Sequence, residues 1–206
     1  PGGSYHFELS SDHIFNTVTN KDLHLPYYLE RSGNHYLSLY PVAGVVLIAP
    51  LYLPSVLGGL PPEHPIFQTL EKVSAASIVA LSAVILYFTL RRVTTHSMAF
   101  TIAGIYALGT SSLSVSSQGL YQHGPSQLAI SVALYGAVRS ITQSSWLAFT
   151  GFWLSFAVIC RPTDVLILAP LFVYLAFKHR WRASLLALGA FPPLLFQFVY
   201  NYEYYG

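Results

Sequence analysis

An uncharged run from Val73 to Leu90 constrains this chain more than any other feature. The run ends in Arg91-Arg92, and its length suits a helix that crosses a hydrocarbon core of roughly 30 Å. Only 9% of the 206 residues are charged and 53% are hydrophobic, whereas soluble domains carry roughly 25% charged residues. The sequence therefore predicts a membrane protein and argues against a soluble globular domain.

Further apolar segments follow this first one. The stretch from Val93 to Val138 is too long for a single span, and it breaks at a polar turn between Ser116 and Pro125. The expected helices cover residues 73–90, 96–115, 125–140, 146–160, 165–177 and 183–200. We therefore predict an all-α polytopic membrane protein with about six transmembrane helices, forming a bundle over residues 61–206.

Residues 41–60 are apolar too, but Pro50, Pro54 and Gly58-Gly59 interrupt them, which is rare in a plain spanning helix. We expect a re-entrant or interfacial segment here. With that assignment the later helices alternate so that the main basic clusters share one side, which the positive-inside rule makes cytoplasmic. These residues are Arg91, Arg92, Arg139, Lys178, Arg180 and Arg182.

Residues 1–40 are polar and rich in His and Tyr, and we expect an external loop with short helical pieces. The chain starts at Pro1 without a Met and stops directly after an apolar segment, so we expect a fragment of a longer protein. A net charge of +2 with scattered basic residues argues against a nucleic-acid partner. No spacing of His, Cys, Asp and Glu is typical of a structural metal site.

One candidate catalytic residue lies in the external loop. Asp12 follows two serines and precedes His13, which suits a general base. The same residues before Ile14 also suit a helix N-cap. Both interpretations of Asp12 stay open.

Candidate ligand-binding residues lie at the expected external ends of helices. Gln122 and His123 suit hydrogen bonds to a phosphate or sugar, although an interfacial turn explains them equally well. Arg161 lies between two apolar segments on the side where basic residues are disfavoured, and such residues are usually paired or functional. Arg161 is expected either to pair with Asp164 alone or to hold a phosphate with its planar fork of donors.

A second aromatic and polar stretch leads into the re-entrant segment. His35 and Tyr36 within it are candidate substrate-binding residues. The alternative is an interfacial belt, the more common role of Tyr at this depth.

Three patterns together carry a family resemblance. They are Gly33-Asn34-His35-Tyr36-Leu37-Ser38-Leu39-Tyr40-Pro41 leading to Pro50-Leu51-Tyr52, then Tyr121-Gln122-His123-Gly124-Pro125, and then Gly151 through Cys160-Arg161-Pro162. The chain resembles part of a GT-C superfamily glycosyltransferase, the polytopic enzymes that use polyprenyl-phosphate sugars, such as protein O-mannosyltransferases and aminoarabinose transferases. The resemblance implies that the chain is a fragment that lacks the family's first transmembrane helix.

The resemblance implies a mannosyltransferase-like enzyme that transfers a sugar, with inversion, to an acceptor hydroxyl. In the family the catalytic acid is an Asp or Asp-Glu pair in the first external loop. Asp12 is the match here, although no Glu follows it. Because the donor phosphate is an anion at the external surface, the expected donor-phosphate residues are Arg161 with His123 and Gln122 near it.

The resemblance also implies the partners and the location. The partners are the bilayer, a polyprenyl-phosphate sugar and an acceptor protein, lipid or glycan. No cofactor is expected beyond this lipid-linked substrate, and a divalent metal is left open. The location is a bacterial or archaeal plasma membrane with the active face external.

A non-enzymatic transporter or assembly subunit is the alternative function. Such a protein is expected to show carboxylates inside its spans or paired inverted repeats. Neither pattern appears in the sequence. An upstream apolar helix ending in an Asp would favour the enzyme.

Overall fold

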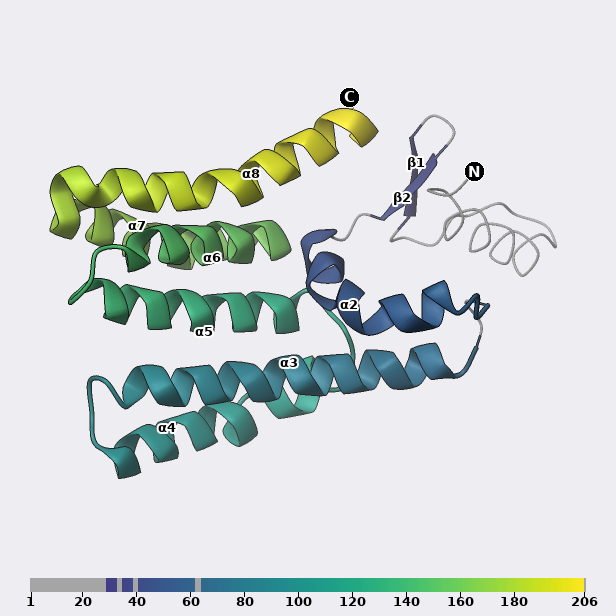
Figure 1. Ribbon diagram of the computed structural model, residues 1–206. Coiled ribbons are helices and arrows are strands. Elements are labelled where there is room, and N and C mark those ends of the chain that lie inside the picture. The colour runs from purple at the N-terminus through teal and green to yellow at the C-terminus, as the bar shows by residue number, and fades with distance from the viewer. Residues whose placement is uncertain (1–28, 33–34, 39–40, 62–63, 206) are drawn as a thin grey trace.

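A computed structural model describes residues 29–32, 35–38, 41–61 and 64–205, and Figure 1 shows its helices stacked side by side. The order across the stack is α4, α3, α5, α6 and α8, with α7 packed against both α6 and α8. The predicted α-helical fold class is confirmed. A short two-stranded antiparallel hairpin lies where only a loop with helical pieces was expected.

Strands form only the hairpin of the described part, and helices make up nearly all the rest. The strands are β1 (Leu29–Ser32) and β2 (His35–Ser38), and the α-helices are α2 (Ala43–Leu57), α3 (Ile66–Leu90), α4 (His96–Gly109), α5 (His123–Ser140), α6 (Trp146–Cys160), α7 (Val165–His179) and α8 (Ala183–Tyr205). Short turns of π-helix at Ser112–Ser116 and of 3₁₀-helix at Pro162–Asp164 and Arg180–Arg182 connect some of them.

Two segments are long and apolar enough to cross a membrane by length and composition. They are Ile66–Leu90 and the run Pro162–Tyr204, while α2 and α6 are apolar but shorter. The second run contains the basic turn at Arg180–Arg182, after which α8 packs back against α7. The count of six membrane spans therefore stays a prediction.

Residues 43–57 form one helix, although the prolines predicted an interruption. Pro50 and Pro54 both lie inside α2, and Tyr52 stacks on Phe67 of α3 with ring centroids 6.1 Å apart. At 1.5 Å per residue α2 is about 22 Å long, which is short of a full hydrocarbon core. Its re-entrant or interfacial placement stays a prediction.

The helix predicted over residues 96–115 ends earlier, at Gly109. Thr110 is extended, and its hydroxyl donates to the carbonyl of Tyr106 at 2.7 Å. The hydroxyl of Ser117 likewise donates to Leu113 at 2.6 Å. Serine and threonine side chains compete for backbone groups in this way, which explains why the serine-rich stretch leaves the α-helix.

Small residues allow a close contact between α6 and α8. A Cβ added at Gly151 would overlap the Leu186 carbonyl, and one added at Gly189 would overlap the Ala148 carbonyl. Membrane helices commonly use small residues to approach this closely, because hydrocarbon offers no hydrophobic drive to bring helices together. The outer faces stay apolar, as Leu166 (78% exposed) and Phe177 (80%) show on α7.

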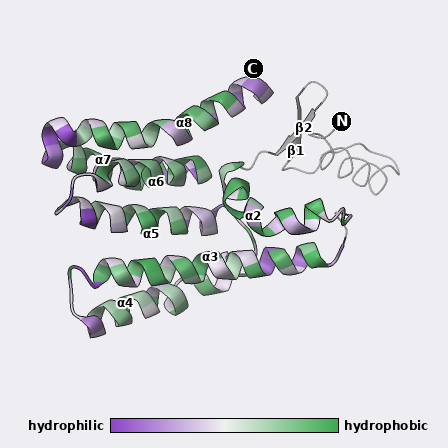
Figure 2. Cartoon of the chain, viewed as in Figure 1, coloured by the Kyte–Doolittle hydropathy of each residue, from purple (hydrophilic) through white to green (hydrophobic). Residues whose placement is uncertain are grey.

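Basic residues gather at one end of the stack, where Figure 2 shows hydrophilic turns joining apolar helices. Arg92 donates to the Tyr135 hydroxyl at 3.4 Å, Arg139 lies over the Trp146 ring, and Arg182 donates to Ser144 at 2.7 Å. These contacts connect the α3–α4, α5–α6 and α7–α8 turns. The basic clusters that were predicted to share a side therefore share one end of the bundle.

Candidate functional site

The predicted site residues occupy several elements. Gln122 directly precedes α5 and His123 begins it, so His123 is helical although the helix was expected to start at Pro125. Both side chains are half-buried, and neither makes a hydrogen bond to another residue in the described part. His35 and Tyr36 lie on β2, where they pair with Ser32 and Arg31 of β1. Asp12 lies outside the described residues.

Arg161 ends α6 in an extended conformation and pairs with Asp164. Its Nη1 lies 3.4 Å from Oδ1 of Asp164, and the backbone N–H of Asp164 donates to the Arg161 carbonyl at 2.9 Å. The ion pair, one of the two interpretations of Arg161, is therefore present, and the phosphate-binding role stays a prediction. The Arg161 side chain remains 41% exposed, whereas the Asp164 side chain is 5% exposed.

Ser126 completes the contacts of Asp164, although no local pattern in the sequence singles it out. The Ser126 hydroxyl donates a hydrogen bond to Oδ2 of Asp164, and Ser126 is itself only 2% exposed. Ser126 lies one helical turn after His123 on α5. The hydrogen bond therefore joins the first turn of α5 to the 3₁₀ turn after α6, across 38 residues of sequence.

The start of α2 lies against this same place. A Cβ added at Gly44 would come within 3.2 Å of Cγ of Pro125, and Ala43 is fully buried. Pro125 is buried as well. The segment that follows the β-hairpin therefore enters the bundle beside the polar contacts of Ser126 and Asp164.

The buried charge of Asp164 is compensated by its neighbours in this cluster. Burying a carboxylate is costly unless it is paired and hydrogen-bonded, and Asp164 has one partner at each oxygen. The guanidinium of Arg161 has five N–H donors, and among the described residues it interacts only with Asp164. Donors thus remain for an anion on the exposed side of Arg161.

A second feature is a cavity of about 700 Å³ between α2 and α3. Apolar side chains of α2 line it together with Phe67, Gln68, Glu71 and Leu120. The Glu71 carboxylate accepts from the backbone N–H of Leu120 at 3.3 Å, just before the turn that carries Gln122. Nothing local in the sequence marks Glu71 as a cavity residue.

Metal-ligating side chains do not cluster in the described part of the chain. Residues 29–32, 35–38, 41–61 and 64–205 contain no group of three or more His, Cys, Asp and Glu side chains that could hold a metal ion. The cofactor prediction stays a prediction.

A family model now adds to this geometry. The model described as "Dolichyl-phosphate-mannose-protein mannosyltransferase" matches residues 72–199, which is more than half of the chain. The chain belongs to this family. No curated protein and no solved structure shows significant similarity to it.

Membership in this mannosyltransferase family indicates that the chain is a membrane glycosyltransferase of the GT-C type. The matched region contains Gln122, His123, Ser126, Arg161 and Asp164. Asp12, His35 and Tyr36 lie before it. The family resemblance predicted from sequence is thus confirmed at the level of the family, and the roles of individual residues are proposals.

Proposed function

We propose that this mannosyltransferase-family chain transfers a sugar from a polyprenyl-phosphate donor to an acceptor hydroxyl on the external face of the membrane, with inversion. The acceptor class is a protein, a lipid or a glycan. One observation carries the proposal: a half-exposed arginine, Arg161, is held by a buried carboxylate at a helix end.

Arg161 binds the donor phosphate in this proposal. A planar guanidinium can present two parallel N–H donors to a phosphate, which a lysine ammonium cannot do. The Asp164 carboxylate offsets part of the desolvation free energy of the Arg161 guanidinium and orients it. Gln122 and His123, at the start of α5, supply further hydrogen-bonding groups for the phosphate or the sugar.

Asp164 serves poorly as the catalytic base, because Ser126 and Arg161 occupy its two oxygens. The proposed base is the Asp12 carboxylate, as the family resemblance implies. His35 and Tyr36 are the proposed substrate-binding residues of the segment that enters the bundle beside Pro125.

The chemistry proceeds in one step. The acceptor oxygen bonds to the anomeric carbon of the sugar while the bond from that carbon to the phosphate oxygen breaks. The acceptor proton passes to Asp12, and the bonding electrons stay on the departing polyprenyl phosphate. Arg161 stabilises that developing negative charge.

Transfer by the purified full-length protein tests the proposal, with a panel of polyprenyl-phosphate hexoses as donors. We expect Arg161→Lys to lower kcat/KM by about tenfold to a hundredfold, since a charge-assisted hydrogen bond contributes about 1.5–3 kcal/mol. Arg180→Lys, at the other end of the bundle, is the matched control. Normal transfer by the Arg161→Lys protein would remove Arg161 from the donor site.

The base is tested separately. Asp12→Asn is expected to lower transfer by about 10²- to 10⁴-fold while donor binding persists. Asn and Asp cap helices about equally well, so a capping role predicts no loss. Unchanged transfer would therefore show that Asp12 is not the base.

A further inference from the structure

A second cavity, of about 450 Å³, lies between α3 and α4 at the opposite end of the bundle from Arg161. The length of α6 separates the two ends of the bundle. This helix begins at Trp146, beside Arg139 of the basic end, and ends just before Arg161. The proposed donor site and this cavity are therefore separate, and a ligand of the cavity is independent of the proposed function.

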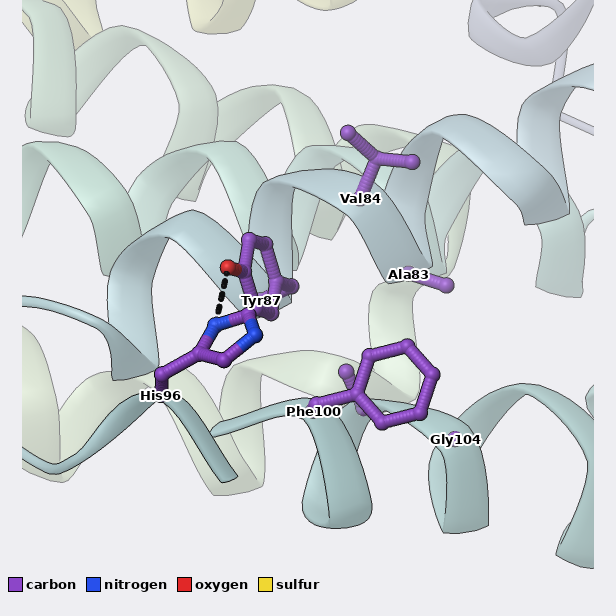
Figure 3. A pocket seen from close by; sticks show the side chains of 7 residues that line it. Ala83, Val84, Tyr87, His96, Phe100 and Gly104 are labelled. Carbon is purple, nitrogen blue, oxygen red and sulfur yellow. Dashed lines mark hydrogen bonds between the residues drawn. The ribbon is translucent and has the colours of Figure 1, made fainter. Parts of the chain in front are cut away.

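The walls of the α3–α4 cavity are apolar and its floor is made of small residues. Ala83 and Val84 of α3 line it together with Phe100 and Gly104 of α4, and Figure 3 shows the Phe100 ring on the side of α4 that lies toward α3. A Cβ added at Gly104 would meet nothing within 4 Å, so the space beside it is open. An extended hydrocarbon chain therefore suits the α3–α4 cavity better than a compact polar ligand does.

One end of the cavity is polar. The Tyr87 hydroxyl and Nδ1 of His96 are hydrogen-bonded at 2.8 Å, as Figure 3 shows. When the Tyr87 hydroxyl donates to Nδ1, the proton of the neutral His96 ring lies on Nε2. This Nε2–H can then donate a hydrogen bond to a ligand. The cavity therefore has a hydrogen-bonding group where it meets the α3–α4 turn.

That turn carries positive charge without a neighbouring carboxylate in the described part of the chain. Arg91 directly follows α3, its side chain is exposed, and its backbone N–H donates to the Tyr87 carbonyl at 2.9 Å. Arg92 is next in the turn. On α3 the nearest acidic residue is Glu71, about 30 Å away along the helix axis.

We propose that the α3–α4 cavity binds an acyl chain of an anionic phospholipid, whose phosphate interacts with His96 and Arg91 at the turn. Charge complementarity favours an anionic over a zwitterionic head group. Basic residues beside membrane helices recognise anionic lipids in this way, and each contributes about 1 kcal/mol near the surface, which is about fivefold in affinity. The basic end is also the predicted cytoplasmic end, where anionic lipids are enriched.

Native mass spectrometry of the detergent-solubilised full-length protein tests this proposal. The probe is an equimolar mixture of phosphatidylglycerol and phosphatidylcholine with identical acyl chains. The wild-type protein is expected to retain phosphatidylglycerol in at least about fivefold preference, since one arginine supplies that much. Equal retention of the two lipids would overturn the proposal.

Two substitutions locate the lipid. A Cβ at position 104 meets no other protein atom within 4 Å, so Gly104→Leu should extend into the cavity and displace most of the bound phosphatidylglycerol, whereas Gly109→Leu on the same helix should not. Arg91→Gln should remove the preference for phosphatidylglycerol, whereas Arg180→Gln should preserve it. Unchanged lipid binding in Gly104→Leu, or a lipid-free dimer that covers the cavity, would disprove the assignment.

Discussion

At one end of the bundle Arg161 is paired with a buried carboxylate, whereas at the other end Arg92 and Arg139 lie over aromatic rings and Arg182 donates to a serine. The ion pair orients one guanidinium and leaves it half-exposed. The contacts at the basic end leave the charge un-neutralised, since the acidic residues of the described part lie elsewhere, Glu30 in β1, Glu71 near the start of α3, Asp164 after α6 and Glu203 near the end of α8. An oriented arginine suits recognition of one ligand, and un-neutralised arginines suit membrane orientation and anionic lipids.

The clearest difference between the two ends should be the membrane face that each one occupies. Single cysteines are introduced by Ser117→Cys and Ser184→Cys in a Cys160→Ala background, because Cys160 is the one cysteine in the chain. A membrane-impermeant maleimide should label position 117 in intact cells and position 184 only after permeabilisation. Labelling of both positions from the same side would refute the opposite placement of the two ends.

The next largest effect should follow removal of the charge that orients Arg161. Asp164→Asn keeps the side-chain size but loses the ion pair, so we expect kcat/KM for the lipid-linked donor to fall about tenfold. The measurement is the donor KM alongside kcat and the thermal unfolding midpoint. A purely structural role would lower the midpoint with no change in donor KM, which would contradict a positioning role for Asp164.

A smaller effect is expected at Ser126, which is neutral. Ser126→Ala removes one hydrogen bond to Asp164 and should lower kcat/KM by about fivefold, equivalent to about 1 kcal/mol. Ser131→Ala is the matched control, because Ser131 is also buried on α5 but does not contact Asp164. Equal losses in the two variants would show that the bond to Asp164 has no specific effect.

The smallest effect is expected at the basic end. Arg182→Gln removes an exposed charge and its contact with Ser144, and exposed interactions of this kind are typically within about 0.5 kcal/mol of neutral. Transfer and the free energy of unfolding should both stay close to wild type. A loss as large as that of Asp164→Asn would mean that the two ends do not differ in the way described.

Much of the helical layout could be predicted because charged residues interrupt apolar runs. Residues 146–160 are helical with the predicted bounds, since Arg161-Pro162 follows directly. The predictions were wrong where side chains act on their own backbone, as at Thr110, or where context tolerates prolines, as in α2. The β-hairpin was missed because the eight residues in its strands show no strong alternation of apolar and polar side chains.

The amino-acid sequence alone shows an apolar helical chain whose basic residues recur at every second connection between helices, and it brings Arg161 within reach of Asp164, three residues away. The contact between Ser126 and Asp164 and the close approach of α6 and α8 at Gly151 and Gly189 arise only from the packing of the helices. They could not be predicted because these helices are apolar on nearly every face. No periodicity then marks which side of a helix faces which neighbour, and only packing selects the partners.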